Sequence, residues 1–118
     1  MFLGLRTIIY PAPDLARTKA WFSRLLGQEP YFDQPFYVGF NVGGYELGLD
    51  PGASLDAGAL TYWGVANIER AVAELESQGA RITAPIQDVG DGIRTASVEG
   101  PPGALIGIIE NPHFQLPA

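Results

Sequence analysis

The feature of this sequence that most constrains its fold is a strand–turn–helix pattern that occurs twice. In the first copy, a β-rich segment at residues 3–10 leads through a proline-containing turn to an amphipathic segment at residues 14–26. Asp14 is well suited to cap the free N–H groups of the first helical turn, and Gly27 can end the helix in the left-handed conformation. The apolar residues of this segment recur at helical spacing, which predicts one buried face. These residues are Leu15, Thr18, Phe22, Leu25 and Leu26.

The second copy begins with a predicted strand at residues 59–65. Asn67 then takes the place of the helix cap, and Gly79 takes the place of the helix end. The predicted buried face of this second helix consists of Ile68, Ala71, Val72 and Leu75. In each copy the helix is followed by three further β-rich segments, so each half of the chain predicts a β-α-β-β-β unit. An internal duplication of this kind predicts two units that pack as pseudo-symmetric partners.

The remaining predicted strands complete the two halves. They lie at residues 31–33, 36–42, 45–49, 81–83, 93–98 and 105–109. Gly43 and Gly44 predict a tight hairpin turn, and Pro85 is expected to end the strand before it. The turn-forming residues 50–54 predict a boundary, with module 1 at about residues 1–52 and module 2 at about residues 57–112. We therefore expect a single α+β domain over residues 1–118. Two pseudo-symmetric βαβββ modules form a curved mixed sheet in it, with a concave cavity and the helices outside.

The composition excludes several classes of function. The 118 residues carry a formal net charge of −6, which argues against nucleic acid as a partner. The sequence contains no cysteine, so it has neither a disulfide framework nor thiol chemistry. No apolar run approaches the roughly 20 residues of a membrane span, and the N-terminus lacks the pattern of a signal peptide. We therefore expect a soluble, cytoplasmic protein with no nucleic-acid or membrane partner.

Several short motifs occur in a characteristic order along the chain. They are Tyr10-Pro11-Ala12-Pro13-Asp14-Leu15, Trp21-Phe22, Leu25-Leu26-Gly27, Tyr45-Glu46-Leu47, Val65-Ala66-Asn67-Ile68, Gly79 and Gly100-Pro101-Pro102-Gly103. In their order and spacing the chain resembles the vicinal oxygen chelate superfamily over roughly residues 3–110. This superfamily includes glyoxalase I, extradiol dioxygenases, fosfomycin-resistance proteins and bleomycin-resistance proteins. The resemblance implies their glyoxalase-like fold of βαβββ modules.

The resemblance also implies where a metal would be held. Enzymes of this superfamily bind a divalent metal in the concave sheet through His, Glu or Gln at four strand positions, which here are Thr7, Glu46, Leu60 and Gly107. Glu46 alone can be a ligand, whereas such metals need three or four His or carboxylate ligands. The single histidine, His113, lies in the tail, and the odd offset of Glu110 from the fourth position turns its side chain to the opposite face. We therefore expect no metal and no other cofactor.

The concave face without its metal is the predicted binding site for a small molecule. Glu46 would orient the ligand, Tyr62 would stack on it, and glycines would open space for it. Alternatively, Glu46 is solvated or paired with an arginine such as Arg94, and Tyr62 only fills the core. The predicted ligand-binding residues are Thr7, Ile9, Phe36, Phe40, Glu46, Leu60, Tyr62 and Gly107.

Two classes of function fit these features. The first is a metal-free binding protein that sequesters a drug-like or cationic ligand, as the bleomycin-resistance branch does. The second is a lyase, isomerase or dioxygenase with a displaced metal site or with Glu46 as a base. No catalytic residue is assigned, and the sequence names no ligand. Phe32, Phe36 and Phe40 are expected to be exposed and predict a homodimer, which leaves open whether modules pair within one chain or swap between two.

Overall fold

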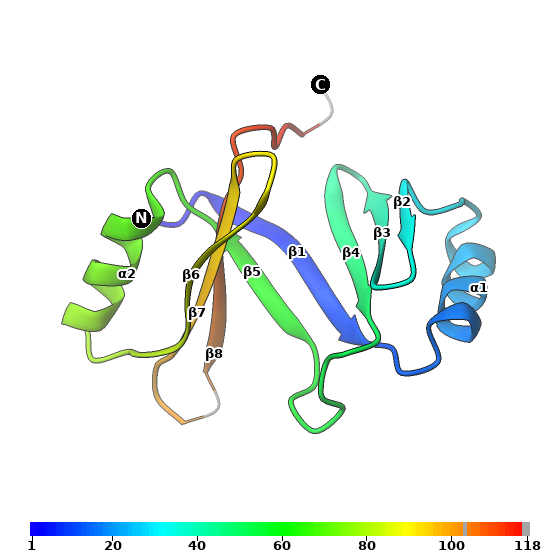
Figure 1. Ribbon diagram of the computed structural model, residues 1–118. Coiled ribbons are helices and arrows are strands. Elements are labelled where there is room, and N and C mark those ends of the chain that lie inside the picture. The colour runs from blue at the N-terminus through cyan, green and yellow to red at the C-terminus, as the bar shows by residue number, and fades with distance from the viewer. Residues whose placement is uncertain (103, 117–118) are drawn as a thin grey trace. The chain divides into compact units, whose positions relative to one another are not determined.

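The computed structural model describes residues 1–102 and 104–116 and confirms the predicted α+β fold. Within these residues the order β-α-β-β-β occurs twice (Figure 1). The first run consists of β1 (Gly4–Pro11), α1 (Leu15–Leu26), β2 (Phe32–Gln34), β3 (Tyr37–Val42) and β4 (Tyr45–Asp50). The second consists of β5 (Leu60–Gly64), α2 (Ile68–Ser77), β6 (Arg81–Gly90), β7 (Ile93–Glu99) and β8 (Leu105–Glu110). The pseudo-symmetry of the modules and the concave cavity stay predictions.

The chain divides into two compact units, which we call unit 1 and unit 2. Unit 1 contains residues 1–6 and the described residues between 61 and 115. Unit 2 contains residues 7–60 and Leu116. Strand β1 therefore begins in unit 1 and continues in unit 2. Neither helix in the described part of the chain is long and apolar enough to span a membrane.

Unit 2 has a mixed sheet with the strand order β2-β3-β4-β1. Strand β1 runs parallel to β4, with Thr7 opposite Glu46, and the other neighbours are antiparallel. Gly43 and Gly44 form the predicted hairpin turn between β3 and β4, with φ values of 62° and 94° that favour glycine. Helix α1 packs on one face of this sheet. The core on that face consists of Ala12, Val38, Phe40 and Leu49, with Leu15, Phe22, Leu26 and Leu47 packed against it.

Unit 1 has the corresponding strand order β5-β8-β7-β6, with β5 parallel to β8 and Tyr62 opposite Gly107. Helix α2 packs beside β6, β7 and β8 (Figure 1). The core between them consists of Val65, Ile68, Ala71, Val72, Leu75, Ala96, Val98 and Ile108. All four residues that the helical spacing predicted on the apolar face of α2 are buried.

The predicted helix ends are confirmed. Asp14 accepts a hydrogen bond from the backbone N–H of Arg17, and Gly27 ends α1 with φ 68°. Asn67 caps α2 through the backbone N–H of Arg70. The predicted apolar face of α1 is wrong at one position, because Leu25 is 64% exposed and lies outside the helix–sheet contact.

Two further predictions are wrong. Strand β6 does not end before Pro85 but runs from Arg81 to Gly90. Proline is tolerated there because β6 pairs only with β7, and the pairing shifts register between Ala84 and Gln87. Phe40 is not exposed but completely buried, because it lies opposite Leu47 and shares the face that α1 covers.

Candidate functional site

The sheet face of unit 2 that points away from α1 carries a carboxylate between two tyrosines. Leu47 and Leu49 of β4 belong to the core under α1, so alternation turns Glu46 to the other face. The Glu46 carboxylate accepts a hydrogen bond from the hydroxyl of Tyr37 at 2.8 Å on Oε1 and one from the hydroxyl of Tyr31 on Oε2. Each carboxylate oxygen thus has one phenol donor, which fixes the orientation of the group. We call these three residues the Glu46 cluster.

Two glycines allow the tyrosines to lie against the sheet. Gly39 of β3 and Gly48 of β4 are directly opposite each other and both are buried. A Cβ atom at Gly48 would overlap the hydroxyl of Tyr37. A Cβ atom at Gly39 would lie 2.9 Å from Oε2 of Glu46 and 3.3 Å from Cε1 of Tyr31. The space left by these glycines is therefore filled by the cluster, so the prediction that glycines of the concave face open space for a ligand is wrong at Gly48.

The Glu46 cluster combines a carboxylate with neutral phenol donors. Partial burial raises the pKa of the Tyr31 phenol, and the hydrogen bond to Glu46 and the charge of that carboxylate raise it further. Tyr31 therefore stays a neutral donor at physiological pH. Within the described residues no Lys, Arg or His lies within ion-pair distance of Glu46. The alternative pairing with Arg94 is wrong, because Arg94 is bound to Glu69 and Glu110.

The structure places three other predicted site residues of unit 2 on the sheet. Thr7 of β1 is 9% exposed and lies opposite Glu46, and Ile9 lies opposite Gly48, so both belong beside the Glu46 cluster. Phe40 does not, because it is buried on the other face against Phe22, with 6.4 Å between ring centroids. We leave Phe40 out of the site.

The remaining predicted residues are Phe36 and Leu60 of unit 2 and Tyr62 and Gly107 of unit 1. Phe36, in the turn between β2 and β3, is 66% exposed and contacts Phe32 edge-on, with 5.9 Å between ring centroids. Leu60 is half-buried at the start of β5. In unit 1 the ring of Tyr62 lies across Gly107, where a Cβ atom would be 2.6 Å from Cδ1 of the ring. The structure therefore brings Tyr62 and Gly107 together as one group and Thr7, Ile9 and Glu46 as another.

Sequence reasoning missed Tyr31 and Tyr37. A signal for them was present, because a hairpin centred on Gly43 and Gly44 places Gly39 opposite Gly48. A facing pair of glycines leaves a gap that an aromatic side chain can cover. Tyr37, on the same face of β3 as Gly39, was the nearest candidate for that cover.

The donor set does not fit the metal of the superfamily. Among the residues that the structure describes, no three His, Cys, Asp or Glu side chains are grouped so that they could hold one ion. Of the four family positions, Leu60 and Gly107 have no side-chain donor atom, and the Glu46 carboxylate is already bound by two phenols. One carboxylate and the Thr7 hydroxyl are too few ligands for a first-row divalent metal.

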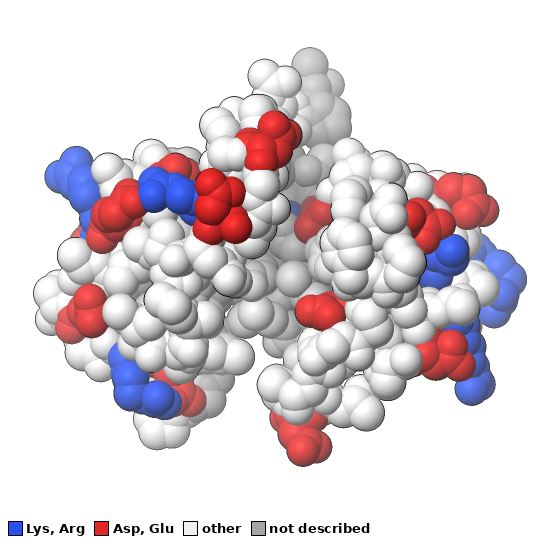
Figure 2. Space-filling view, viewed as in Figure 1, with Lys and Arg blue, Asp and Glu red and all other residues white. Residues whose placement is uncertain are grey.

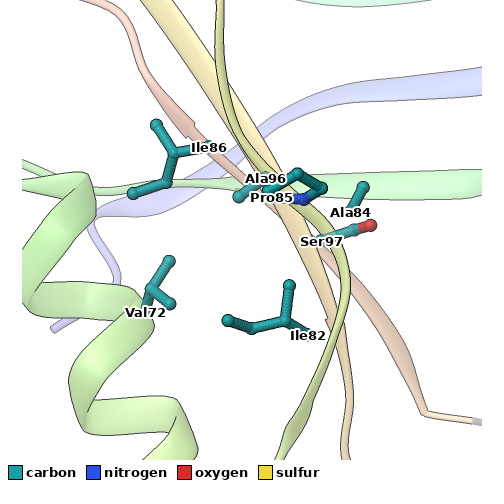
Figure 3. Close-up of a pocket in the computed structure, with 7 residues that line it drawn as sticks. All are labelled: Val72, Ile82, Ala84, Pro85, Ile86, Ala96 and Ser97. Atoms are coloured by element: carbon teal, nitrogen blue, oxygen red, sulfur yellow. The ribbon is translucent and has the colours of Figure 1, made fainter.

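Two cavities open on the helix sides of the units, and neither includes the Glu46 cluster. The cavity in unit 1 measures about 320 Å³ and lies between α2, β6 and β7 (Figure 3). Its walls are aliphatic except for Ser97, whose hydroxyl is hydrogen-bonded to Thr83 at 2.8 Å. The cavity in unit 2 measures about 440 Å³ and lies beside α1 and β2, where Lys19 and Asp33 form an ion pair. Acidic side chains lie on both units in the view of Figure 2.

Comparison with solved structures shows the same fold in proteins of distant sequence. A variant of Streptomyces coelicolor methylmalonyl-CoA epimerase, in complex with 2-nitronate-propionyl-CoA, has a TM-score of 0.78 at 16% identity. The match covers 95% of this chain and 99% of that one. A glyoxalase/bleomycin resistance protein/dioxygenase superfamily member from Vibrio splendidus 12B01 has a TM-score of 0.69 at 21% identity, with 90% and 97% covered. A hypothetical protein from Bacillus halodurans C-125 has a TM-score of 0.75 at 15% identity, with 97% of each chain covered.

The sequence itself matches none of the curated proteins. It does match the family model described as Glyoxalase/Bleomycin resistance protein/Dioxygenase superfamily, over residues 4–108. That match includes both helices and nearly all of the strands described above. The chain therefore belongs to the glyoxalase/bleomycin resistance protein/dioxygenase superfamily, as its motifs predicted.

Proposed function

We propose that the protein binds a small organic cation, without a metal, on the face of unit 2 that carries the Glu46 cluster. The observation that supports this proposal is a carboxylate held by two neutral phenols, with no cationic side chain of the described residues beside it. A half-buried charge without a counter-ion is unfavourable in free energy. A cationic ligand would provide the counter-ion that the described side chains do not.

The chemistry around the carboxylate favours an organic cation. The two phenols orient Glu46 but leave its charge in place, so an ammonium or amidinium group would gain a charge-assisted hydrogen bond. Tyr31 is 63% exposed, and a cation over an exposed aromatic ring gains roughly 0.5–1 kcal/mol. The net charge of −6 attracts cations at longer range. Bleomycin-resistance proteins give the superfamily part of its name, so sequestration of a cationic, drug-like molecule is our proposed role.

The test is a calorimetric titration of EDTA-treated protein with benzylammonium and, as its neutral counterpart, benzyl alcohol. We expect saturable binding of the cation alone. Glu46→Gln should weaken it at least about tenfold, the usual scale for losing an interaction with a charged partner. Glu76→Gln, at an exposed acid of α2, is the matched control and should bind like the native protein. Equal binding by Glu46→Gln, or binding that requires added metal, would contradict the proposal.

A second candidate is an isomerase or lyase that uses Glu46 as a base. Its support is the oriented carboxylate, because a base with both oxygens positioned can meet an acidic C–H of a bound substrate. An incubation in D₂O distinguishes the two candidates. The protein is mixed with a molecule that binds to it and has an acidic C–H group. Deuterium exchange into that molecule, abolished by Glu46→Gln, would establish proton transfer. Binding without exchange would leave sequestration as the function.

We also propose that the protein forms a homodimer through the exposed aromatic surface at β2. Phe32 is 38% exposed and Phe36 is 66% exposed, and an apolar patch of this kind often marks an interface. Light scattering should give twice the chain mass of 12.6 kDa, and Phe36→Ser should shift the mass towards that of one chain. A mass of one chain for the native protein at micromolar concentration would refute this proposal.

A further inference from the structure

Unit 1 contains a cationic side chain whose surroundings differ from those of the other half-buried cations. Three of the seven Lys and Arg residues are half-buried: Arg6, Lys19 and Arg94. Lys19 is paired with Asp33 at 3.0 Å, and Arg94 is paired with Glu69 and Glu110. Arg6 has no carboxylate within ion-pair distance among the residues that the structure describes. Among the described residues, Arg6 is therefore the half-buried cation without a carboxylate partner, although the chain has 13 acidic residues.

The Arg6 side chain is nevertheless held in place. Its Cζ atom lies 3.8 Å from the centroid of the Phe114 ring, and its Nη1 donates a hydrogen bond of 3.0 Å to the backbone carbonyl of Leu5. It also packs on Gly64, where a Cβ atom would lie 2.6 Å from Nε and 2.8 Å from Cζ. Any other residue at position 64 would therefore displace the guanidinium. The guanidinium is planar by itself, and ring, carbonyl and glycine together hold it in one orientation before any ligand binds.

The segment after β8 holds Phe114 in this position. The Nε2 atom of His113 lies 2.8 Å from the backbone carbonyl oxygen of Asp91, in the turn between β6 and β7. The backbone N–H of His113 donates to Oδ1 of Asn111 at 2.9 Å. These contacts anchor the residue next to Phe114, so the ring over Arg6 is part of the folded unit.

We propose that Arg6 is an anion-binding residue that takes the carboxylate of a small organic molecule. Nη1 of Arg6 donates its hydrogen bond to the backbone carbonyl of Leu5. The N–H groups on the edge formed by Nε and Nη2 have no acceptor among the described residues. This edge matches the two oxygens of a carboxylate, which arginine binds in bidentate fashion. Because the guanidinium is already held against the Phe114 ring, less conformational entropy is lost when a carboxylate binds. The site lies in unit 1 and does not depend on the proposed function of the Glu46 cluster.

The test is a titration of the whole protein with sodium benzoate in low-chloride buffer, followed by the NMR resonance of the Arg6 Nε–H group. We expect a saturable shift for Arg6 with a dissociation constant in the range of about 1–10 mM, the scale of one ion pair. Arg17, an exposed arginine of α1, is the internal control and should show no saturation. Arg6→Lys keeps the positive charge but loses the pair of N–H donors that binds both carboxylate oxygens, so it should weaken benzoate binding about tenfold. Phe114→Leu should weaken it less.

Inorganic phosphate is the second arm of the experiment. If phosphate binds Arg6 more tightly than benzoate does, the site recognises a phosphoryl group and the carboxylate assignment is wrong. If the Arg6 resonance of the native protein responds no more than that of Arg17, the site does not exist. This measurement needs no variant, so a folding defect of Arg6→Lys cannot obscure it. Unchanged benzoate affinity in a folded Arg6→Lys protein would also overturn the proposal.

Discussion

Unit 1 and unit 2 have the same order of elements and the same strand order, yet they use their helices differently. In unit 1, α2 buries Ile68, Ala71, Val72 and Leu75. In unit 2, no residue of α1 is fully buried, and Trp21 and Leu25 are 51% and 64% exposed. The same topology therefore carries a tightly packed helix in one unit and a loosely packed helix in the other.

The two units also differ in how they hold a central glutamate. In unit 1, Glu110 accepts hydrogen bonds from the Arg94 guanidinium and from the backbone N–H of Ile68, at 3.0 Å each. In unit 2, Glu46 is held by two phenols that carry no charge. Glu110 is thus paired with a cation and joins β8, β7 and the start of α2, whereas Glu46 has no cationic partner among the described residues. This difference indicates that the glutamate of unit 1 contributes to stability, and it is the basis of our proposal that a ligand binds to unit 2.

The largest expected effect compares the first residue of each helix. Ile68→Ala removes a completely buried side chain and should lower the free energy of unfolding by about 2–5 kcal/mol. Leu15→Ala, at the matching position of α1, removes a half-buried side chain and should cost about 1–2 kcal/mol. Chemical denaturation measures both variants. Equal losses would show that the two helices are packed equally well and would remove the contrast between the units.

The next effect compares two glycines that lie under tyrosines. Gly48→Ala places a methyl group against the hydroxyl of Tyr37, and Gly107→Ala places one against the ring of Tyr62. Both variants should be destabilised by about 1–3 kcal/mol, because the tyrosine must move. Gly48→Ala alone should also weaken benzylammonium binding, because it displaces a donor from Glu46. If Gly107→Ala weakens that binding to the same extent, the site is not confined to the cluster in unit 2.

Much of the fold could be predicted because its signals are local. Asp14, Asn67 and Gly27 act within one helical turn of their own positions, and the Gly43-Gly44 turn fixes its own hairpin. The burial of Phe40 could not be predicted from local signals in the same way. Val38, Phe40 and Val42 alternate with the other residues of β3, so the strand places Phe40 on one face with Val38. Which face of the sheet α1 covers depends on the pairing of Phe40 with Leu47. The prediction that the strand ends before Pro85 was wrong because a strand with a single partner strand, such as β6, can contain a proline.

The candidate site was predictable only in part. The family position identified Glu46, and the loss of ligands at Leu60 and Gly107 was readable from the residue types. The partners of Glu46 were not, because Tyr31 lies outside the regular strands and reaches the carboxylate through a contact 15 residues away in sequence. Arg94 illustrates the same limit, since its pairing with Glu69 and Glu110 depends on how α2 packs on the sheet.

A smaller effect concerns acid sensitivity in unit 1. Hydrogen bonds from Arg94 hold the pKa of Glu69 below its ordinary value of 4.5. The folded state then binds fewer protons than the unfolded state, so this pair stabilises the fold above pH 4.5 and the contribution is lost as the pH falls below that value. Arg94→Gln should therefore flatten the fall in urea midpoint between about pH 3 and 5. A slope unchanged from the native protein would show that Glu69 gains nothing from Arg94, as is common for exposed pairs.

The smallest effect concerns the ionisation of Tyr31 in unit 2 at alkaline pH. Partial burial, the hydrogen bond to Glu46 and the charge of Glu46 raise the pKa of Tyr31 above its ordinary value of 10.0. The folded state holds this proton more tightly than the unfolded state, so the contribution is fully present below pH 10 and is lost as the pH rises further. In the ultraviolet absorbance of tyrosinate, Tyr31→Phe should remove a late-ionising step. Glu46→Gln should move that step to lower pH without abolishing it, because burial, the largest cause, remains. A titration curve that Glu46→Gln leaves unchanged would show that the phenol and the carboxylate do not interact, and the cluster on which the proposed function rests would be wrong.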